Sequence, residues 1–521
     1  MLPDTLRNMD LKKILPHSFL LLSTVALHAQ PGILKMTPVQ SLDMDSVQVE
    51  VPAKFKSKMS GTYKVFLPKK FKARIFYVGG LNKPRFMSFD DHGTLLVADD
   101  NSSALGNIYA MPDKDGDGVA DTAIKISSGY TYNHDVKYYK NAMYVTEWNK
   151  VWKCTDDDSD GIYENKNIFI DSIAYGIPIG NHVTRTLVFD SINHKAYLSI
   201  GSRSNVGRET ERAIIRQYNE DGSGSRIFAT GIRNAVGLAL HPKTNRLWAN
   251  NNGSDNQGNE VPPEWIDMVR DQGFYGHPFA YGNQVWFNFD TADYIGLKPI
   301  TATDSSLVQS MVEPAALIRA HQAPMGLMFL NDKFPAFQKG FLCAVHGSWN
   351  TTAPNAYRGY KVIYGDLSND ADTTVNYVAD FCSGFLTDSI NRVFWARPVG
   401  LVLDKTGNLF ISSDEGNKFI MEVYPDKTGM KEIHGKTEWK IYPNPVDDEL
   451  IIEIELRRPS SLAAGIFDPE GREILTWKVQ IQEFPATSQE IKLNTSSLKP
   501  GIYFCRIQCG EEILFSKFIR Q

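Results

Sequence analysis

The chain has 521 residues, of which 42% are hydrophobic and 22% charged, with 39 glycines and 26 prolines. This composition is typical of a globular protein and excludes a collagenous, coiled-coil or mostly disordered chain. Lys and Arg number 55 against 60 Asp and Glu, a net charge of -5. No bulk positive field therefore points to a nucleic acid or an anionic membrane as partner, and a small or neutral ligand is favoured.

The N-terminus has the pattern of a secretory signal peptide. A basic segment at residues 9–13 precedes an apolar run at residues 14–27 and the small residue Ala29, which predicts a signal peptide over residues 1–29. The run is shorter than the ~20 residues that a membrane-spanning helix needs, and no later segment is long enough either, so no membrane span is expected. Residues 30–59 are interpreted as an N-terminal linker.

A hairpin-like unit recurs along the next part of the chain. Each copy has a polar or Pro-containing approach, an apolar strand, a turn of Gly, Asn or Asp, and a second strand. The copies begin at Lys83, Asn133, Asn181, Ile232, His321 and Ala396. One hairpin cannot bury both faces, but copies stacked in a ring can, so six copies predict an all-β, six-bladed β-propeller over residues 60–430. A tandem of β-sandwiches is the alternative.

Polar side chains occur just before the first strand of most copies, where a propeller has the mouth of its central channel. They are His134, His182, Arg233 with Asn234, His321 and Arg397. Convergence of these groups on one axis would make a site. His182 is the sharpest candidate, because an imidazole can take a proton near neutral pH. From the residues alone, a structural histidine at 182 and a structural salt bridge at Arg233 remain open.

Two loops in the first two copies alternate carboxylates with other residues. The acidic residues are Asp113, Asp115, Asp117 and Asp121 in one loop, and Asp156, Asp158, Asp160 and Glu164 in the other. Such spacing places hard oxygen ligands on one side of a tight turn, which suits a structural Ca²⁺ ion. Neither loop has the complete EF-hand spacing, and a solvated hairpin tip is the alternative.

The five cysteines are too few and too irregularly spaced for a disulfide framework or a zinc site. They are Cys154, Cys343, Cys382, Cys505 and Cys509. Since a signal peptide implies an oxidising compartment, a single bridge such as Cys343 with Cys382 remains open.

Seven motifs follow one another in order between Phe66 and Tyr424. They read GNHVTRTLVF, GIRNAVGLALHP, NNGSDNQGNEVPPEW, GFYGHPF, AHQAPMGLMF, FLCAVHGSWN with RGYKV shortly after it, and ARPVGLVLD. These motifs resemble the glucose/sorbosone dehydrogenase family, whose members are soluble six-bladed propellers that use pyrroloquinoline quinone. The resemblance implies a quinone- and Ca²⁺-dependent enzyme that oxidises the C1 hydroxyl of a sugar or related aldose by hydride transfer to the quinone. Its electron acceptor is unknown.

The resemblance also implies roles for residues of the third and fourth copies. His182 falls on the family's histidine motif and would be the general base. Arg233 and Asn234 fall on its Arg-Asn pair and would contact the quinone, with Arg233 polarising the reacting carbonyl. The backbone of Gly253 and Ser254 would hold the cofactor calcium.

Further cofactor-binding residues are implied in the last two copies. Arg397 falls on the arginine that clamps the cofactor, and His321, His346 and Lys361 lie in matching motifs. The loop ending in Glu260 departs from the family, since Gly-Asn-Glu stands where related sequences tend to have an acidic Gly-Asp-Asp run, and this loss of carboxylates would weaken calcium and quinone binding.

Two other functions remain open. A Ca²⁺-dependent lactonase-type propeller hydrolase would need carboxylate and Asn ligands at the channel centre, where this chain is richer in His and Arg. A non-catalytic glycan- or protein-binding propeller would spread its basic groups around the ring instead of gathering them.

The C-terminal part, residues 438–521, has short strands with turn punctuation, which predicts a small β-sandwich. Its Tyr-Pro-Asn-Pro at residues 442–445, Asp-Pro-Glu-Gly-Arg-Glu at 468–473 and Leu-Lys-Pro-Gly-Ile-Tyr at 498–503 resemble the type A sorting domain of the type IX secretion system. The resemblance implies a Gram-negative, Bacteroidetes-like source and a secreted or cell-surface protein that passes through the periplasm, with the type IX machinery as partner. An ordinary carbohydrate-binding sandwich is the alternative.

Overall fold

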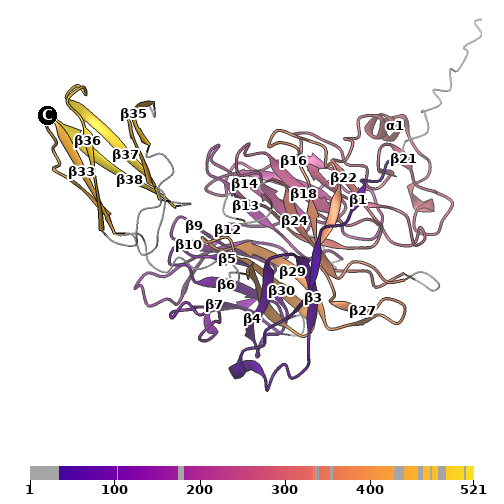
Figure 1. Ribbon diagram of the computed structural model, residues 1–521. Coiled ribbons are helices and arrows are strands. Elements are labelled where there is room, and N and C mark those ends of the chain that lie inside the picture. Colours follow the sequence, from indigo (N-terminus) through magenta and orange to yellow (C-terminus); the bar gives the residue numbers. More distant parts are fainter. Residues whose placement is uncertain are drawn as a thin grey trace, which may run out of the picture. The chain divides into compact units, whose positions relative to one another are not determined.

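The chain forms two compact units, Met1–Asp426 and Lys427–Gln521, in the computed structural model. The signal peptide predicted over residues 1–29 lies outside the residues that the structure describes. The described residues are 34–101, 104–173, 181–331, 334, 337, 339–351, 356–426, 439–455, 462–469, 472–478, 488–509 and 512–521. The regular secondary structure of both units is almost entirely strand (Figure 1), which confirms the expected all-β class.

The first unit contains six sheets in which four antiparallel strands follow one another, within the described residues. The first three sheets are β5 (Pro84–Phe89), β6 (Leu95–Asp99), β7 (Gly106–Met111) and β8 (Ile124–Tyr130); β9 (Val136–Tyr139), β10 (Ala142–Thr146), β11 (Val151–Thr155) and β12 (Asn165–Ile170); and β13 (Leu187–Asp190), β14 (Lys195–Ile200), β15 (Ile214–Asn219) and β16 (Arg226–Thr230).

The other three sheets are β17 (Leu238–Leu240), β18 (Leu247–Asn251), β19 (Glu264–Met268) and β22 (Ala316–Ile318); β23 (Pro324–Phe329), β24 (Phe341–Val345), β25 (Lys361–Gly365) and β26 (Val378–Cys382); and β29 (Ala396–Leu403), β30 (Leu409–Gly416), β31 (Phe419–Pro425) and β4 (Phe71–Val78).

The first strands of the six sheets contact one another in a closed cycle, in the order β5, β9, β13, β17, β23, β29 and back to β5. The sixth sheet combines both ends of the unit, because its outermost strand β4 comes from the N-terminal side and pairs with β31. The chain segments before these first strands therefore meet at one end of a common axis, where the sequence placed its polar candidates.

The described part of the predicted linker is paired with the sheets. Strand β1 (Val39–Gln40) lies parallel to β26, and β2 (Met44–Gln48) pairs with β3 (Lys64–Pro68). The short helix η1 (Ala53–Phe55) lies between β2 and β3. The side chains of Val49, Phe55 and Met59 belong to the same apolar core as Phe71 and Phe381. This segment is thus part of the fold, a difference from the sequence-based interpretation that arises because its few apolar residues follow no clear period.

The largest insertion separates β19 from β22. It contains β20 (Ala280–Tyr281), β21 (Val285–Trp286), η2 (Ile295–Leu297) and α1 (Ala302–Gln309), whose first turn has a capping box between Thr301 and Asp304. A smaller hairpin, β27 (Leu386–Asp388) and β28 (Val393–Phe394), precedes β29. Both insertions lie in the later sheets, as the wider repeat spacing predicts.

The possible bridge between Cys343 and Cys382 is absent, and both are buried free thiols, as are Cys154 and Cys505. Cys343 lies in β24 and Cys382 in β26, with β25 between them. Two strand spacings separate their Cα atoms by roughly 9–10 Å, which is beyond the reach of a disulfide.

The second unit has two sheets around one apolar core. One contains β32 (Trp439–Tyr442), β33 (Glu449–Glu455) and β36 (Ser488–Asn494), and the other contains β35 (Glu473–Lys478), β34 (Leu462–Phe467), β37 (Gly501–Cys509) and β38 (Glu512–Arg520). Ile452 and Ile491 of the first sheet and Ile466, Ile507 and Phe518 of the second are buried together.

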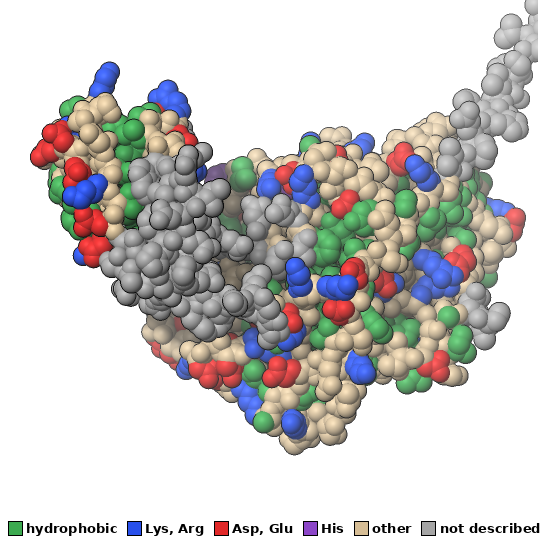
Figure 2. Space-filling view, in the orientation of Figure 1, with side chains coloured by type: hydrophobic (Ala, Val, Ile, Leu, Met, Phe, Trp, Pro, Cys, Tyr) green, Lys and Arg blue, Asp and Glu red, His purple; other side chains and the backbone are tan. Residues whose placement is uncertain are grey.

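No helix in the described part of the chain is long and apolar enough to cross a membrane. On the face of the first unit that Figure 2 shows, basic and acidic side chains are intermixed, which agrees with the near balance of charge in the sequence.

Candidate functional site

His182 precedes β13, the first strand of the third sheet. Its imidazole contacts Ser202, which follows β14, the second strand of the same sheet. Its Nδ1 lies 2.9 Å from the carbonyl oxygen of Ser202 and 2.9 Å from Ser202 Oγ. The hydroxyl of Ser202 donates its own proton to the carbonyl of Ser204, and a carbonyl can only accept. Nδ1 therefore carries the imidazole proton, which leaves Nε2 with an unshared electron pair.

The surroundings of His182 keep its imidazole neutral. Burial lowers the pKa of His182 well below its usual value, and the positive charge of Arg233 lowers it further. A neutral imidazole with its proton on Nδ1 presents Nε2 as a base.

Arg233 lies at the start of the fourth sheet and is almost completely buried. Its guanidinium donates to the carbonyls of Asn205 at 2.9 Å and Gly253 at 2.6 Å, and lies 3.4 Å from the carboxylate of Asp255. Burial lowers its pKa from the ordinary arginine value. The Gly253 carbonyl that the sequence assigned to calcium thus has one lone pair engaged by Arg233, while the hydroxyl of Ser254 is bonded to Tyr294.

His182 and Asn234 meet across Gly201. A Cβ atom built on Gly201 would lie 2.5 Å from Asn234 Oδ1 and 2.7 Å from the Cβ of His182, so only glycine allows this approach. The Oδ1 atom of Asn234 is buried and has no hydrogen-bond partner. An unsatisfied acceptor beside a base is typical of a site that binds a ligand.

His277 is a further member of this group that the sequence analysis did not select. Its Nε2 is buried without a hydrogen-bond partner. Burial, with a smaller effect from Arg233, lowers its pKa to about 3. The only sequence signal was its place in the GFYGHPF motif.

A second group of polar residues comes from the fifth, sixth, first and second sheets. Asp414 accepts from His346 Nε2 at 2.7 Å and is also ion-paired with Arg85, and Arg85 Nε donates to His134 Nδ1 at 3.2 Å. Burial would raise the pKa of Asp414, but His346 and Arg85 outweigh this effect and hold it well below the usual range. Since Nδ1 of His134 accepts, its Nε2 carries the proton, and this buried atom has no partner.

Arg397 connects this second group to the loop after β24. Its Nε donates to the carbonyl of His346 at 3.0 Å and its Nη2 to that of Gly347 at 2.7 Å, while Nη1 pairs with Glu415 at 2.5 Å. The guanidinium also lies over the ring of Tyr360, 5.1 Å from its centroid. Arg397 and His346 are therefore in contact, as expected for residues of one site.

Comparison with known proteins shows the family. Residues 67–423 match the family model described as TrAA12-like. The chain belongs to the TrAA12-like family. Residues 440–521 match the model of a secretion system C-terminal sorting domain, so the resemblances stated for both parts of the sequence are confirmed at family level.

Relatives of the TrAA12-like unit include three curated proteins. A pyrroloquinoline quinone-dependent sugar dehydrogenase of Hypocrea jecorina is 24% identical over 67% of this chain and 87% of its own length. A pyrroloquinoline quinone-dependent pyranose dehydrogenase of Coprinopsis cinerea is 24% identical over 66% of this chain, which spans 53% of that enzyme. An uncharacterized protein of Borreliella burgdorferi is 27% identical over 71% of this chain and 92% of its own.

Solved structures share the fold of the TrAA12-like unit. The holo form of the pyranose dehydrogenase quinone domain from Coprinopsis cinerea has a TM-score of 0.56 at 20% identity, covering 72% of this chain and 98% of that one. The calcium structure of the Trichoderma reesei family AA12 protein has a TM-score of 0.57 at 19% identity, covering 69% and 96%.

Two predicted cofactor residues of the TrAA12-like unit have other contacts. His321 Nε2 lies 2.9 Å from the carbonyl of Gly258, so it supports the polar loop. Lys361 Nζ lies 2.6 Å from Asp380 and lines a groove of about 800 Å³ together with Glu260. Within the described residues, neither side chain is bonded to His182, Arg233 or Arg397.

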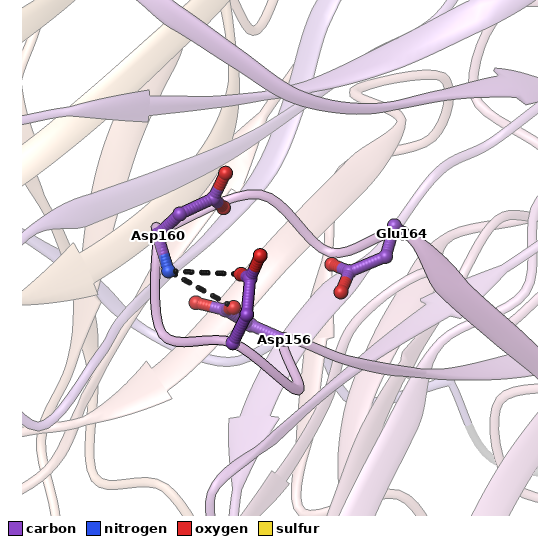
Figure 3. A group of neighbouring side chains, drawn as sticks. Asp156, Asp160 and Glu164 are labelled. Carbon is purple, nitrogen blue, oxygen red and sulfur yellow. Dashed lines mark hydrogen bonds between the residues drawn. The ribbon is translucent and has the colours of Figure 1, made fainter.

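The acidic loops of the TrAA12-like unit connect the third and fourth strands of the first two sheets. Ligand atoms of Asp113, Asp115 and Asp117 lie within 4.8 Å of one another, as do those of Asp156, Asp158, Asp160 and Glu164. Figure 3 shows Asp156, Asp160 and Glu164 around the second loop. Asp121 is not in the first group, and its carboxylate accepts from the backbone of Lys114 at 3.0 Å.

Proposed function

We propose that the TrAA12-like unit is a six-bladed propeller that oxidises the C1 hydroxyl of a sugar or related aldose with pyrroloquinoline quinone, and that His182 is the general base. The main support is the placement of a neutral imidazole, with its proton on Nδ1, beside Arg233 and Asn234 in a chain of this family. The closed cycle of first strands supports the propeller interpretation.

The side chains present fit the quinone. Pyrroloquinoline quinone carries three carboxylates and two adjacent carbonyls, so it needs cations and N–H donors. The two groups supply Arg233 and Arg397 as cations, and His134 Nε2 as a buried donor without a partner. Arg233, Asn234, Arg397 and His346 would hold the cofactor.

The residues of this chain have distinct tasks in the proposed reaction. The quinone, when bound, supplies a two-electron acceptor for the C1 hydride. His182 Nε2 takes the proton of the C1 hydroxyl, and the Ser202 carbonyl accepts the Nδ1 proton throughout and stabilises the imidazolium. Because burial and the charge of Arg233 disfavour a positive charge on His182, the proton is readily released to solvent afterwards.

The calcium assignments are part of the same proposal. Gly253 and Ser254 would offer main-chain carbonyls to the cofactor calcium, which would act as a Lewis acid and orient the quinone. Gly253 keeps a second lone pair beside the one that Arg233 uses. The two acidic loops would hold structural calcium ions. His321 and Lys361 have no support from their contacts and stay predictions.

A hydrolase of the lactonase type is less well supported. Such a site needs metal-ligating carboxylates at the centre, whereas Asp414, a buried carboxylate of the second group, is occupied by His346 and Arg85. A propeller that only binds a ligand would not require a neutral imidazole at His182 with its proton held on Nδ1.

The C-terminal unit supports export. We propose that it directs the protein to the type IX secretion machinery of a Bacteroidetes-like bacterium, which makes the enzyme secreted or attached to the cell surface. A sugar from outside the cell would then be its substrate, with an electron acceptor of unknown identity.

Reconstitution tests the proposed function. The full chain is loaded with pyrroloquinoline quinone and Ca²⁺, quinone absorbance is titrated, and dye reduction is measured against a panel of aldoses. We expect sugar-dependent reduction that His182→Ala abolishes and that His92→Ala, a change at an exposed histidine, leaves intact. Absence of quinone binding would contradict the proposal.

A further inference from the structure

His182 has a backbone conformation that needs external support. Its φ of 51° lies in the left-handed region, which is unfavourable for a residue with a side chain. The orientation of the imidazole therefore depends on groups that hold the main chain around residue 182.

Arg212 reaches this segment from the approach to β15. Its Nε donates to the carbonyl of Gly201 at 2.8 Å, and its Nη2 lies 2.9 Å from the carbonyl of Asn181, 3.1 Å from that of His182 and 3.1 Å from that of Ser202. One guanidinium thus bridges the segment that carries the base and the segment that carries its acceptor.

Arg185 supports the same segment from the start of the third sheet. Its Nη1 donates to the carbonyls of His182 at 2.8 Å and Thr184 at 2.7 Å. The side chain is 1% exposed, and no carboxylate among the described residues forms an ion pair with it. A buried cation without a carboxylate is costly, and the two carbonyls are the acceptors that offset part of this cost.

The carbonyl oxygen of Ser202 accepts two hydrogen bonds, one from Arg212 and one from Nδ1 of His182. If this carbonyl turned away, Nδ1 would lose the acceptor that fixes the tautomer, and Nε2 would no longer be committed as the base. A planar guanidinium can serve several carbonyls at fixed angles, whereas a lysine ammonium is a point charge on a flexible stem.

We propose that Arg212, assisted by Arg185, is the positioning residue that fixes the orientation and tautomer of His182. This inference rests on the proposed function of His182 as a base. Arg212 itself does not touch substrate or quinone in this role. The charged and titratable groups facing the imidazole are Arg233, Arg212 and His277, and Arg185 faces its carbonyl.

Arginine variants of the full chain test the proposal with two readouts. The first is exchange of the imidazole Cε1 hydrogen of His182 with deuterium across pH, followed by mass spectrometry of its peptide, which needs neither sugar nor quinone. The second is kcat and KM for sugar oxidation. The variants are Arg212→Lys, Arg212→Gln and Arg185→Lys, and the matched control is Arg216→Gln in β15, whose guanidinium pairs with Glu211.

We expect Arg212→Lys and Arg212→Gln to lower kcat by roughly 100-fold with KM nearly unchanged, as a small misplacement of a reacting group does. Both variants should change the exchange profile of His182, and Arg216→Gln should change neither readout. Normal exchange and kcat in Arg212→Lys would overturn the proposal, because a positive charge without the planar guanidinium would then be enough to order His182.

The two hypotheses fail in different ways. If no variant and no wild-type protein oxidises any sugar, the proposed function is wrong, and the exchange profile still decides whether Arg212 orders His182. If Arg212→Gln does not fold by circular dichroism, Arg212→Lys and Arg185→Lys decide the outcome, and unchanged exchange in both overturns the inference.

Discussion

His182 donates its Nδ1 proton to the main-chain carbonyl of Ser202, 2.9 Å away. Among the described residues, no carboxylate is hydrogen-bonded to this imidazole. The imidazole is therefore held by a carbonyl and a hydroxyl, and burial, together with the nearby charge of Arg233, keeps its pKa low. The hydrogen bond between His182 and Ser202 therefore fixes which nitrogen of the imidazole carries the proton.

Ser202→Asp should make the activity more sensitive to acid. A carboxylate beside Nδ1 favours the imidazolium, so the pKa of His182 rises. Because the base must be unprotonated, the acid limb of the kcat/KM profile moves to higher pH in the variant, whereas the wild-type protein stays active below the usual histidine pKa of about 6.5. The pH profiles of the two proteins measure the shift.

Ser172→Asp, at an exposed position, is the control for added charge and should keep the wild-type profile. An unchanged acid limb in Ser202→Asp would mean that His182 does not limit the rate as a base.

Asp414→Asn should destabilise the first unit by about 3 kcal/mol, because it removes the buried counter-charge of the largely buried Arg85. The pKa of Asp414 is depressed in the folded state. Its stabilising contribution is therefore complete above the unfolded pKa of about 3.9 and is lost as the pH falls further. Urea unfolding at pH 7 and at pH 3.5 measures both effects.

Asp43→Asn, which removes an exposed partner of Lys69, is the control and should change the free energy of unfolding little at either pH. Equal stability of Asp414→Asn and the wild-type protein at pH 7 would show that the ion pair contributes nothing net.

Part of the candidate site could be predicted from the sequence because that part is local. His182 and Arg233 precede the first strand of a repeat, and Arg397 is the second residue of such a strand, β29. Such positions can be recognised from strand periodicity alone. Arg212 and Asp414 could not be recognised in this way. Arg212 contacts residues 10 to 31 positions away, and Asp414 contacts residues 68 and 329 positions away. Nothing in the local pattern reports which carbonyl or imidazole a side chain will reach.

The same reason explains the differences in the fold. The pairing of β1 with β26 joins residues that are more than 300 positions apart, and a two-residue strand has no period to detect. Lys361 was selected through its motif, but its position in the third strand of a sheet directs it to Asp380. Chain-wide repeats were visible in the sequence, whereas individual long-range contacts were not.

Calcium should bind the loop of Asp156 and Asp160, because four carboxylates share one small volume. In calorimetric titration of the metal-free full chain with Ca²⁺, the number of ions bound per chain should fall when both residues are changed to Asn. Ligand at about 100 times its dissociation constant adds about 2.7 kcal/mol of stability, so thermal unfolding of the wild-type protein should shift upward with Ca²⁺.

Asp388→Asn, in a turn without other carboxylates of its own, is the control and should keep the wild-type stoichiometry. Identical titrations for the wild-type protein and the double variant would show that this loop is only a solvated turn.

Truncation after Asp426 should leave the first unit folded and able to bind quinone, whereas truncation after Gly416 should not. The difference lies in β31, which pairs with β30 on one side and with the N-terminal strand β4 on the other. Without β31 the sixth sheet loses the strand that joins the two ends of the unit, and buried side chains such as Phe419 and Met421 are lost from the core. Calorimetry should show one cooperative transition for the longer fragment and none for the shorter. A cooperative transition in the shorter fragment would mean that the cycle of sheets does not depend on this closure.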